Sequence, residues 1–151
     1  MTDHKQHMLT ALKAVFIPAL RQRGFKGSLP HFYRKTPARA DFVSIQFYSA
    51  GGSFVVEIAC CPTDGPATGP GKGLPLSRLN TTYFGTGRIR LTQEADGQAG
   101  EQWFSFGPRS YEPDQPIQAA AHYETVAASL LPLLDTQAES WWAAHPDSAT
   151  R

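Results

Sequence analysis

Two neighbouring stretches of alternating residues constrain the fold of this 151-residue chain more than any other feature. They cover residues 41–48 and 53–61 and are joined by Ser49-Ala-Gly-Gly52. A period of two residues is typical of a β-strand with one buried face, and a short connection containing Gly-Gly suits a hairpin turn. The two stretches therefore predict an antiparallel hairpin at the centre of a sheet.

The alternation also assigns the side chains of this hairpin to the two faces of the sheet. One face carries an apolar row that we expect to face helices: Val43, Ile45, Phe47, Phe54, Val56 and Ile58. The other face, called the open face below, would carry Ser44, Gln46, Tyr48 and Glu57. Helices are therefore expected to cover at least one face of the sheet.

A helix is predicted for residues 3–23, because apolar residues recur there at spacings of three and four. They are Met8, Leu9, Leu12, Phe16, Ala19 and Leu20. Pro18 lies inside this segment and predicts a kink or a break near residues 15–18. Gly24 followed by Phe25 predicts the end of the helix, with the glycine in the left-handed conformation and the phenylalanine folded back on Leu20.

Three more short strands are predicted from their residue patterns, at residues 31–35, 88–92 and 102–106. We expect the last two to form a second hairpin, which gives a sheet of about five strands. Residues 62–80 are rich in proline and glycine and form a connection that is long for a compact domain. Such a length indicates a mobile or a functional loop.

The C-terminal part is predicted to be helical from Asp114, with an interruption at Pro132 and a last short helix over residues 133–144. That last helix carries Trp141 and Trp142. Two adjacent helical residues cannot both face the same way, so we expect one tryptophan to close the core and the other to be exposed or at an interface.

These elements together predict an α+β fold: an N-terminal helix, an antiparallel sheet of about five strands, and C-terminal helices packed on the sheet. The length indicates a single domain, residues 1–144, followed by a frayed tail, residues 145–151.

The cysteines and the hydropathy of the chain indicate its compartment. Cys60 and Cys61 are adjacent and would point to opposite faces of their strand, where they suit small buried residues in a reducing environment. The N-terminal residues form no apolar signal core, and no run approaches the ~20 apolar residues of a membrane span. We therefore expect a cytoplasmic protein without a membrane segment.

Charge is distributed unevenly along the chain, although the formal net charge is only +1. Residues 1–90 contain 12 lysines and arginines against 4 acidic residues, whereas residues 91–151 contain 2 against 9. Such segregation can steer a charged partner, or the two halves can neutralise each other on folding. The small net charge argues against a protein that coats nucleic acid.

Two patterns that could bind a cofactor or a metal are incomplete. Gly71-Lys72 is part of a phosphate-binding loop pattern, but Pro66 stands where that loop needs a glycine and Gly73 where it needs serine or threonine. His4 and His7 lie one helical turn apart, without the three or four ligands of a metal site, and are expected in a solvated N-terminus. No cofactor, metal or catalytic residue is assigned.

The open face gives the sharpest candidate site. Glu57 is the one carboxylate predicted inside the central sheet, and a cross-strand pair with Arg88 or Arg90 is its simplest role. A raised pKa could instead make Glu57 a general base. Because tyrosine, tryptophan and arginine are the usual anchors of binding surfaces, we predict a binding site on this face. Its residues are Gln46, Tyr48, Glu57, Arg88, Arg90 and Trp103. The alternative is a solvated face, or one covered by the C-terminal helices.

Four short segments carry a resemblance to a known family. A helix segment, residues 12–18, leads into Arg23-Gly-Phe25 and is followed by Phe32-Tyr-Arg34. A strand with a glutamine among apolar residues, Val43-Ser-Ile-Gln46-Phe, comes next, and then Arg88-Ile-Arg-Leu91 with Trp103-Phe104. In this order the chain resembles the bacterial domain-of-unknown-function family 4304 over about residues 8–135.

The resemblance has limits and consequences. The chain departs from the family's pattern after the glutamine-bearing strand, where Tyr48 to Gly52 form a short turn instead of a long polar loop. The resemblance implies a fold and a compartment rather than an established activity. Small bacterial proteins of this kind are thought to lie beside toxin genes, so the resemblance also favours an immunity role.

The leading functional prediction is a non-enzymatic protein-binding domain, most concretely an immunity-type antagonist that occupies a toxin by charge and shape complementarity. One alternative is a small-ligand binder or an enzyme, with Glu57 as the base and Arg88 and Arg90 holding an anion. The other is an oligomeric domain that self-associates through Trp141 or Trp142. Nucleic acid and membranes are not expected partners.

Overall fold

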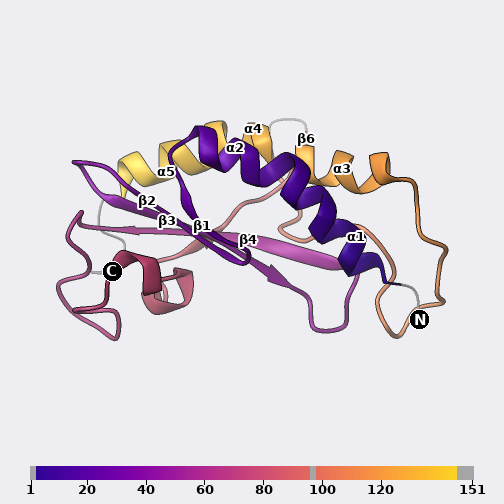
Figure 1. Ribbon diagram of the computed structural model, residues 1–151, viewed down its shortest axis with the longest axis horizontal. Coiled ribbons are helices and arrows are strands. Elements are labelled where there is room, and N and C mark those ends of the chain that lie inside the picture. Colours follow the sequence, from indigo (N-terminus) through magenta and orange to yellow (C-terminus); the bar gives the residue numbers. More distant parts are fainter. Residues whose placement is uncertain (1–2, 96–97, 146–151) are drawn as a thin grey trace.

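The structure of this protein is a computed structural model that describes residues 3–95 and 98–145. It has the predicted α+β architecture: helices from both ends of the chain lie along one face of a central antiparallel sheet (Figure 1). Residues 62–84, which include two short 3-10 helices, lie on the opposite side of the sheet (Figure 1). The sheet is therefore the middle layer of the molecule.

The N-terminal helical segment consists of α1 (His4–Ala11), a π-helical turn η1 (Leu12–Phe16) and α2 (Ile17–Gln22). The disturbance predicted near Pro18 is present as this π-helical turn, in which the amide of Ile17 bonds to the carbonyl of Leu12. Proline has no amide to donate and crowds the preceding turn, so a wider turn just before it lets the helix continue. The end of the helix is as predicted: Gly24 has φ 88° and the Phe25 amide donates to the Leu20 carbonyl at 3.0 Å.

The sheet has six strands, and each hydrogen-bonded pair is antiparallel. In spatial order the first four are β1 (Lys26–Ser28), β2 (His31–Lys35), β3 (Ala40–Phe47) and β4 (Ser53–Cys61), so the predicted central hairpin is β3–β4. Its register pairs Val43 with Ile58 and Phe47 with Phe54. The predicted apolar row therefore shares one face, under the helices.

The predicted second hairpin is wrong. β5 (Ile89–Arg90) and β8 (Phe104–Ser105) both pair with the outer edge of β4, through Ile58 opposite Ile89 and Phe54 opposite Phe104. Between them the chain forms a separate small hairpin of β6 (Glu94–Ala95) and β7 (Gln98–Ala99). β4 is nine residues long and buried throughout, so its edge accommodates two short strands end to end.

The C-terminal segment begins its helix later than predicted. Helix α3 (Ala120–Ala128) follows an irregular stretch, so the start expected at Asp114 is wrong. In that stretch the Gln115 carbonyl bonds to His4 Nε2 at 3.0 Å, while His4 Nδ1 lies 3.0 Å from the Tyr123 hydroxyl. His4 is therefore buried, although we expected it to be solvated. It links the start of α1 to α3 and to the stretch before α3.

The remaining helical turns are α4 (Leu131–Leu133), the π-helical turn η4 (Leu134–Ala138) and α5 (Glu139–Ala144). Pro132 lies in the first turn of α4, where its missing amide costs nothing. Trp142 in α5 is fully buried and donates its indole N–H to the Ala59 carbonyl at 3.0 Å. Of the frayed tail predicted for residues 145–151, all but His145 lies outside the described residues.

Two hydrophobic clusters lie on the two faces of the sheet. The larger one joins the helices to the face that carries Val43, Ile45 and Cys60. The smaller one joins the opposite face, at Phe42 and Cys61, to the connection after β4. Cys60 and Cys61 thus point to opposite faces, as predicted, and the proline- and glycine-rich connection covers part of the face that we called open.

The cover over that face comes from two 3-10 helices, η2 (Leu76–Arg78) and η3 (Thr81–Phe84). Leu79 and Phe84 are buried there, and the Phe84 ring lies 5.1 Å from the Phe42 ring. The C-terminal part of this connection is therefore packed against the sheet. The candidate site lies beside it.

Candidate binding site on the open sheet face

Glu57 is the centre of the candidate site. It lies on β4 opposite Ser44 on one side and Arg90 on the other, and it is buried. Its Oε1 atom lies 3.6 Å from Arg88 Nη1 and its Oε2 atom 3.3 Å from Arg90 Nε. The hydroxyl of Thr81 in η3 donates to Oε1 at 3.2 Å. The predicted cross-strand pairing of Glu57 with these arginines is confirmed.

We call Glu57, Thr81, Arg88 and Arg90 the open-face cluster. Its two arginines keep about a third of their side-chain surface exposed, 33% for Arg88 and 32% for Arg90. Both arginines offset the cost of burying the Glu57 carboxylate, because a buried charge without partners is costly. Each guanidinium group thus pairs with Glu57, and each arginine side chain remains partly exposed to solvent.

Beside this cluster lie three aromatic side chains, which we call the aromatic patch: Tyr48, Trp103 and Tyr111. The rings of Tyr48 and Trp103 lie 5.3 Å apart, and the Arg90 guanidinium lies 5.5 Å from the Trp103 ring. Tyr111 is 70% exposed, and a hydrogen bond with the Tyr48 side chain raises the pKa of Tyr111. The patch is therefore continuous with the arginines of the open-face cluster.

The structure brings together five of the six residues predicted for the site. Tyr48, Glu57, Arg88, Arg90 and Trp103 form one chain of contacts. Gln46 shares the face but pairs with Val55 and is exposed, two residues along β3 from the Ser44 that pairs with Glu57. Tyr111 was missed, because it lies in an irregular segment where no periodicity assigns a face.

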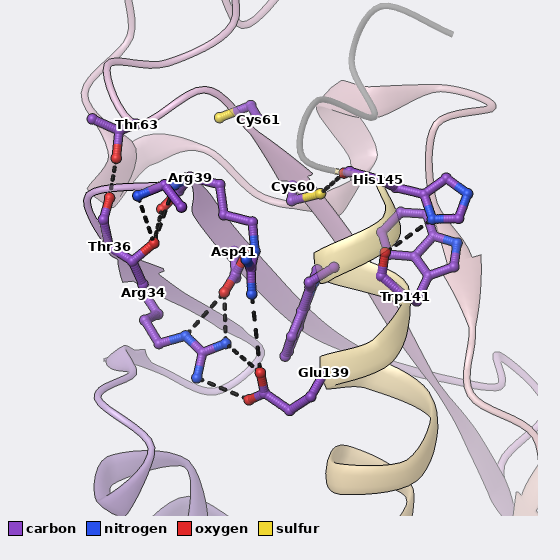
Figure 2. Close-up of polar contacts among 12 residues, drawn as sticks. Arg34, Thr36, Arg39, Asp41, Cys60, Cys61, Thr63, Glu139, Trp141 and His145 are labelled. Atoms are coloured by element: carbon purple, nitrogen blue, oxygen red, sulfur yellow. Dashed lines mark hydrogen bonds and ion pairs between the residues drawn. The ribbon is translucent and has the colours of Figure 1, made fainter.

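A second arginine–carboxylate cluster lies on the other face of the sheet, on β2 and β3 and under the helices. We call Arg34, Arg39, Asp41 and Glu139 the helix-side cluster; Figure 2 shows Arg34 between Asp41 on β3 and Glu139 on α5. Arg34 Nη2 lies 2.6 Å from Asp41 Oδ2, and Arg34 Nη1 lies 2.9 Å from Glu139 Oε1. Arg39 Nε lies 2.7 Å from Asp41 Oδ1. This cluster joins two strands of the sheet to the last helix.

The helix-side cluster was also missed by the sequence analysis, although a signal exists. Asp41 has the same strand parity as Val43, so the alternation that predicts the apolar row also places this carboxylate under the helices. Burial raises the pKa of Asp41, and the guanidinium groups of Arg34 and Arg39 oppose that shift. Arg34 in turn packs 4.6 Å from the Phe25 ring and 5.1 Å from the Trp142 ring.

The two tryptophans of α5 divide as predicted. Trp142 closes the core, whereas Trp141 is partly exposed and stacks on His145 with ring centroids 4.7 Å apart. Trp142 is therefore not available to another chain in the folded protein, and a self-interface at this helix would depend on Trp141.

Both oxygens of Glu57 have partners within the cluster. Two arginines and a threonine hydroxyl engage them. Exposed guanidinium edges beside tyrosine and tryptophan rings are the chemistry of protein interfaces.

Residues 3–95 and 98–145 hold no group of three or more His, Cys, Asp or Glu side chains placed to bind a metal ion. Within that part of the chain, each helix is too short or too polar to cross a bilayer.

Comparison with known proteins identifies the family. Neither the curated proteins nor the solved structures contain a match to this chain. Residues 16–144 match the family described as Domain of unknown function (DUF4304). This match covers most of the chain, including the strands of both clusters and the helices over them. The protein therefore belongs to the DUF4304 family.

Proposed function

We propose that this protein is a non-enzymatic protein-binding domain and that the aromatic patch together with Arg88 and Arg90 forms its binding surface. The observation that carries the proposal is the continuous contact from Tyr48 through Trp103 to Arg90, on the face opposite the helices. Tryptophan, tyrosine and arginine are the residues that most often dominate binding energy at protein interfaces.

The charge of the binding surface indicates the charge of its partner. Glu57 compensates part of the charge of Arg88 and Arg90, and their exposed sides can still pair with carboxylates of a partner. Folding neutralises some of the charge segregation along the chain, since Arg23 pairs with Asp135 and Arg34 with Glu139. We therefore propose a partner with an acidic patch, which the arginines attract and orient.

The finer proposal is that the partner is a toxin and that this protein is its cytoplasmic antagonist in a bacterium. Two properties support it: a positively charged binding surface suits fast association with a partner, and two buried thiols on opposite sides of β4 suit a reducing compartment. Self-association through Trp141 is a separate proposal, which light scattering at several concentrations would test.

The main test is affinity capture with the tagged protein in lysate of its native host, followed by native mass spectrometry of the eluate. We expect one stoichiometric protein partner, which is lost with Arg88→Glu and with Trp103→Ala while circular dichroism shows an intact fold. Lys35→Glu is the matched charge-reversal control, because Lys35 is an exposed residue of β2 and lies outside both clusters. Equal capture by all four proteins would contradict the proposed surface.

A further inference from the structure

A groove of about 990 Å³ opens between the N-terminal helical segment and the free end of β3. It lies at the edge of the sheet rather than at the aromatic patch. Its size is at the upper end of the range of small-molecule pockets, which is roughly 300–1,000 Å³.

The groove exists because β2 is shorter than β3. The pairing of the two strands ends at His31 opposite Ser44, and the chain then turns away through Leu29 and Pro30. The last bond across this edge runs from the Ile45 amide to the Pro30 carbonyl, at 2.9 Å. Beyond it, Gln46 and Phe47 of β3 have no strand on that side among the described residues.

One wall of the groove is a single stripe of the N-terminal helical segment. Its residues follow one another at intervals of four and alternate between cationic and apolar: Lys5, Leu9, Lys13, Ile17 and Arg21. Side chains four apart lie on the same side of a helix. Ile45, Phe47 and Leu29 form the apolar floor and end of the groove.

The cations of this wall are not neutralised by the protein itself. Within residues 3–95 and 98–145, no carboxylate lies within ion-pair distance of Lys5 or Lys13. The Lys5 ammonium lies 4.9 Å from the Phe47 ring, and the Arg21 guanidinium donates to the Phe25 carbonyl at 3.2 Å. Glu57 also borders the groove, but Arg88 and Arg90 engage it. Lys13, midway along the stripe, is therefore the cation best placed to take an anion.

We propose that this groove binds a small amphiphilic anion, a molecule with an apolar body and one carboxylate or similar head, with Lys13 as the main partner of the head. The apolar body would lie against Leu9, Ile17 and Phe47, where it leaves water without losing hydrogen bonds. The head would form a charge-assisted hydrogen bond with the Lys13 ammonium group, for which no carboxylate of the described residues is within ion-pair distance.

Two other occupants fit the groove less well. A peptide strand could pair with β3 only over residues 45–47, because the turn at Leu29 and Pro30 closes the space beyond. A second copy of this chain would bring Lys5 and Lys13 against another set of lysines, which costs free energy. The proposal does not depend on the proposed protein-binding function, although Glu57 and Thr81 of the open-face cluster also line the groove.

The test is a calorimetric titration of the full chain with decanoate, compared with decyltrimethylammonium, which has the same apolar length and a cationic head. We expect one saturable site for decanoate, and weaker binding of the cationic analogue. Lys13→Glu should weaken decanoate binding by roughly tenfold or more, because one charge-assisted hydrogen bond contributes about 1.5–3 kcal/mol. Lys35→Glu, the matched control, should bind decanoate as the unmodified protein does.

Two further variants test where the binding site lies. Leu9→Trp should fill the groove and also weaken binding, while Trp103→Ala should leave decanoate affinity unchanged even if it abolishes partner capture. Lack of saturable decanoate binding, or equal losses in Lys13→Glu and Lys35→Glu, would overturn the proposal. Tighter binding of a hexaglutamate peptide than of decanoate would also overturn it and assign the groove to an acidic chain.

Discussion

Two arginine–carboxylate clusters lie on opposite faces of the sheet, and they differ mainly in their exposure. In the helix-side cluster Asp41 is fully buried and Arg34 is only 12% exposed, between the sheet and α5. In the open-face cluster Glu57 is nearly as buried, but Arg88 and Arg90 are each about a third exposed. The same pair of residue types thus occurs once inside the molecule and once at its surface.

The different surroundings of Arg34 and Arg90 give these two arginines different roles. Each side of Arg34 contacts the protein: Asp41 and Glu139 bind its nitrogens, and the rings of Phe25 and Trp142 pack against it. Arg34 is therefore not available to a partner molecule, and it holds α5 against the sheet. Arg90, by contrast, contacts Glu57 and Trp103 and still reaches solvent, so it can bind another molecule.

The largest expected effect is on stability, from Asp41→Asn. The substitution removes the carboxylate that faces both Arg34 and Arg39, and breaking a buried ion pair from one side costs about 3–5 kcal/mol. Urea denaturation should show this loss as a lower free energy of unfolding. Glu139→Gln is the milder comparison, because that side chain is 36% exposed; an equal loss in both would contradict a cluster centred on Asp41.

Glu57→Gln should have a smaller effect on stability, of about 1–3 kcal/mol. The amide keeps the shape of the side chain and can still accept from Thr81, while Arg88 and Arg90 can turn toward water. The same denaturation experiment measures it. A loss larger than that of Asp41→Asn would reverse the order of the two clusters.

Trp103→Ala should separate binding from folding. The ring is half-buried and contacts Tyr48 and Arg90, so its removal should cost only about 1 kcal/mol of stability. As an anchor of the proposed interface it should cost about 2 kcal/mol or more of binding free energy, measured by calorimetry with the captured partner. Unchanged affinity would remove the aromatic patch from the interface.

The smallest expected effect is a pH dependence from His31, whose Nδ1 lies 2.9 Å from the Ser44 hydroxyl at the rim of the groove. Burial lowers the pKa of His31 below its ordinary value of 6.5, so the unfolded chain takes up a proton more readily than the folded one. Its contribution to stability is therefore present in full above about pH 6.5 and is lost as the pH falls through that value toward the folded pKa.

His31→Gln keeps a hydrogen-bonding group near Ser44 and removes the titration. Free energies of unfolding measured by urea denaturation at about pH 7.5 and about pH 5 should differ less in this variant than in the unmodified protein. An identical pH dependence in both proteins would show that His31 does not contribute to it.

The parts of the fold that could be predicted from the sequence are those with a strict alternation of apolar and polar residues. The hairpin of residues 41–61, its buried face and the pairing of Glu57 with Arg88 and Arg90 follow from a period of two, which determines faces without knowledge of the tertiary structure. The helix start at Asp114 was wrong, because residues 114–119 are irregular and make a tertiary contact with His4 that local patterns do not encode.

The candidate site was predicted as far as the same period extends. Trp103 and Tyr48 could be placed on the correct face, while Tyr111 could not, since an irregular segment has no face to assign. The helix-side cluster needed α5 to be placed over β3, and Glu139 lies almost a hundred residues from Asp41 in the chain. Such long-range pairs depend on packing that a single sequence does not reveal.

The most direct test of the division between the two clusters is urea denaturation of Arg34→Met and Arg90→Met in parallel. Methionine keeps much of the apolar length of arginine and removes its charge, so the comparison isolates the ion pairs. The account predicts that Arg34→Met lowers the free energy of unfolding several times more than Arg90→Met, because Arg34 is only 12% exposed and pairs with both Asp41 and Glu139, whereas Arg90 is 32% exposed and pairs with Glu57 alone. Equal losses in the two variants would contradict the assignment of one cluster to folding and the other to binding.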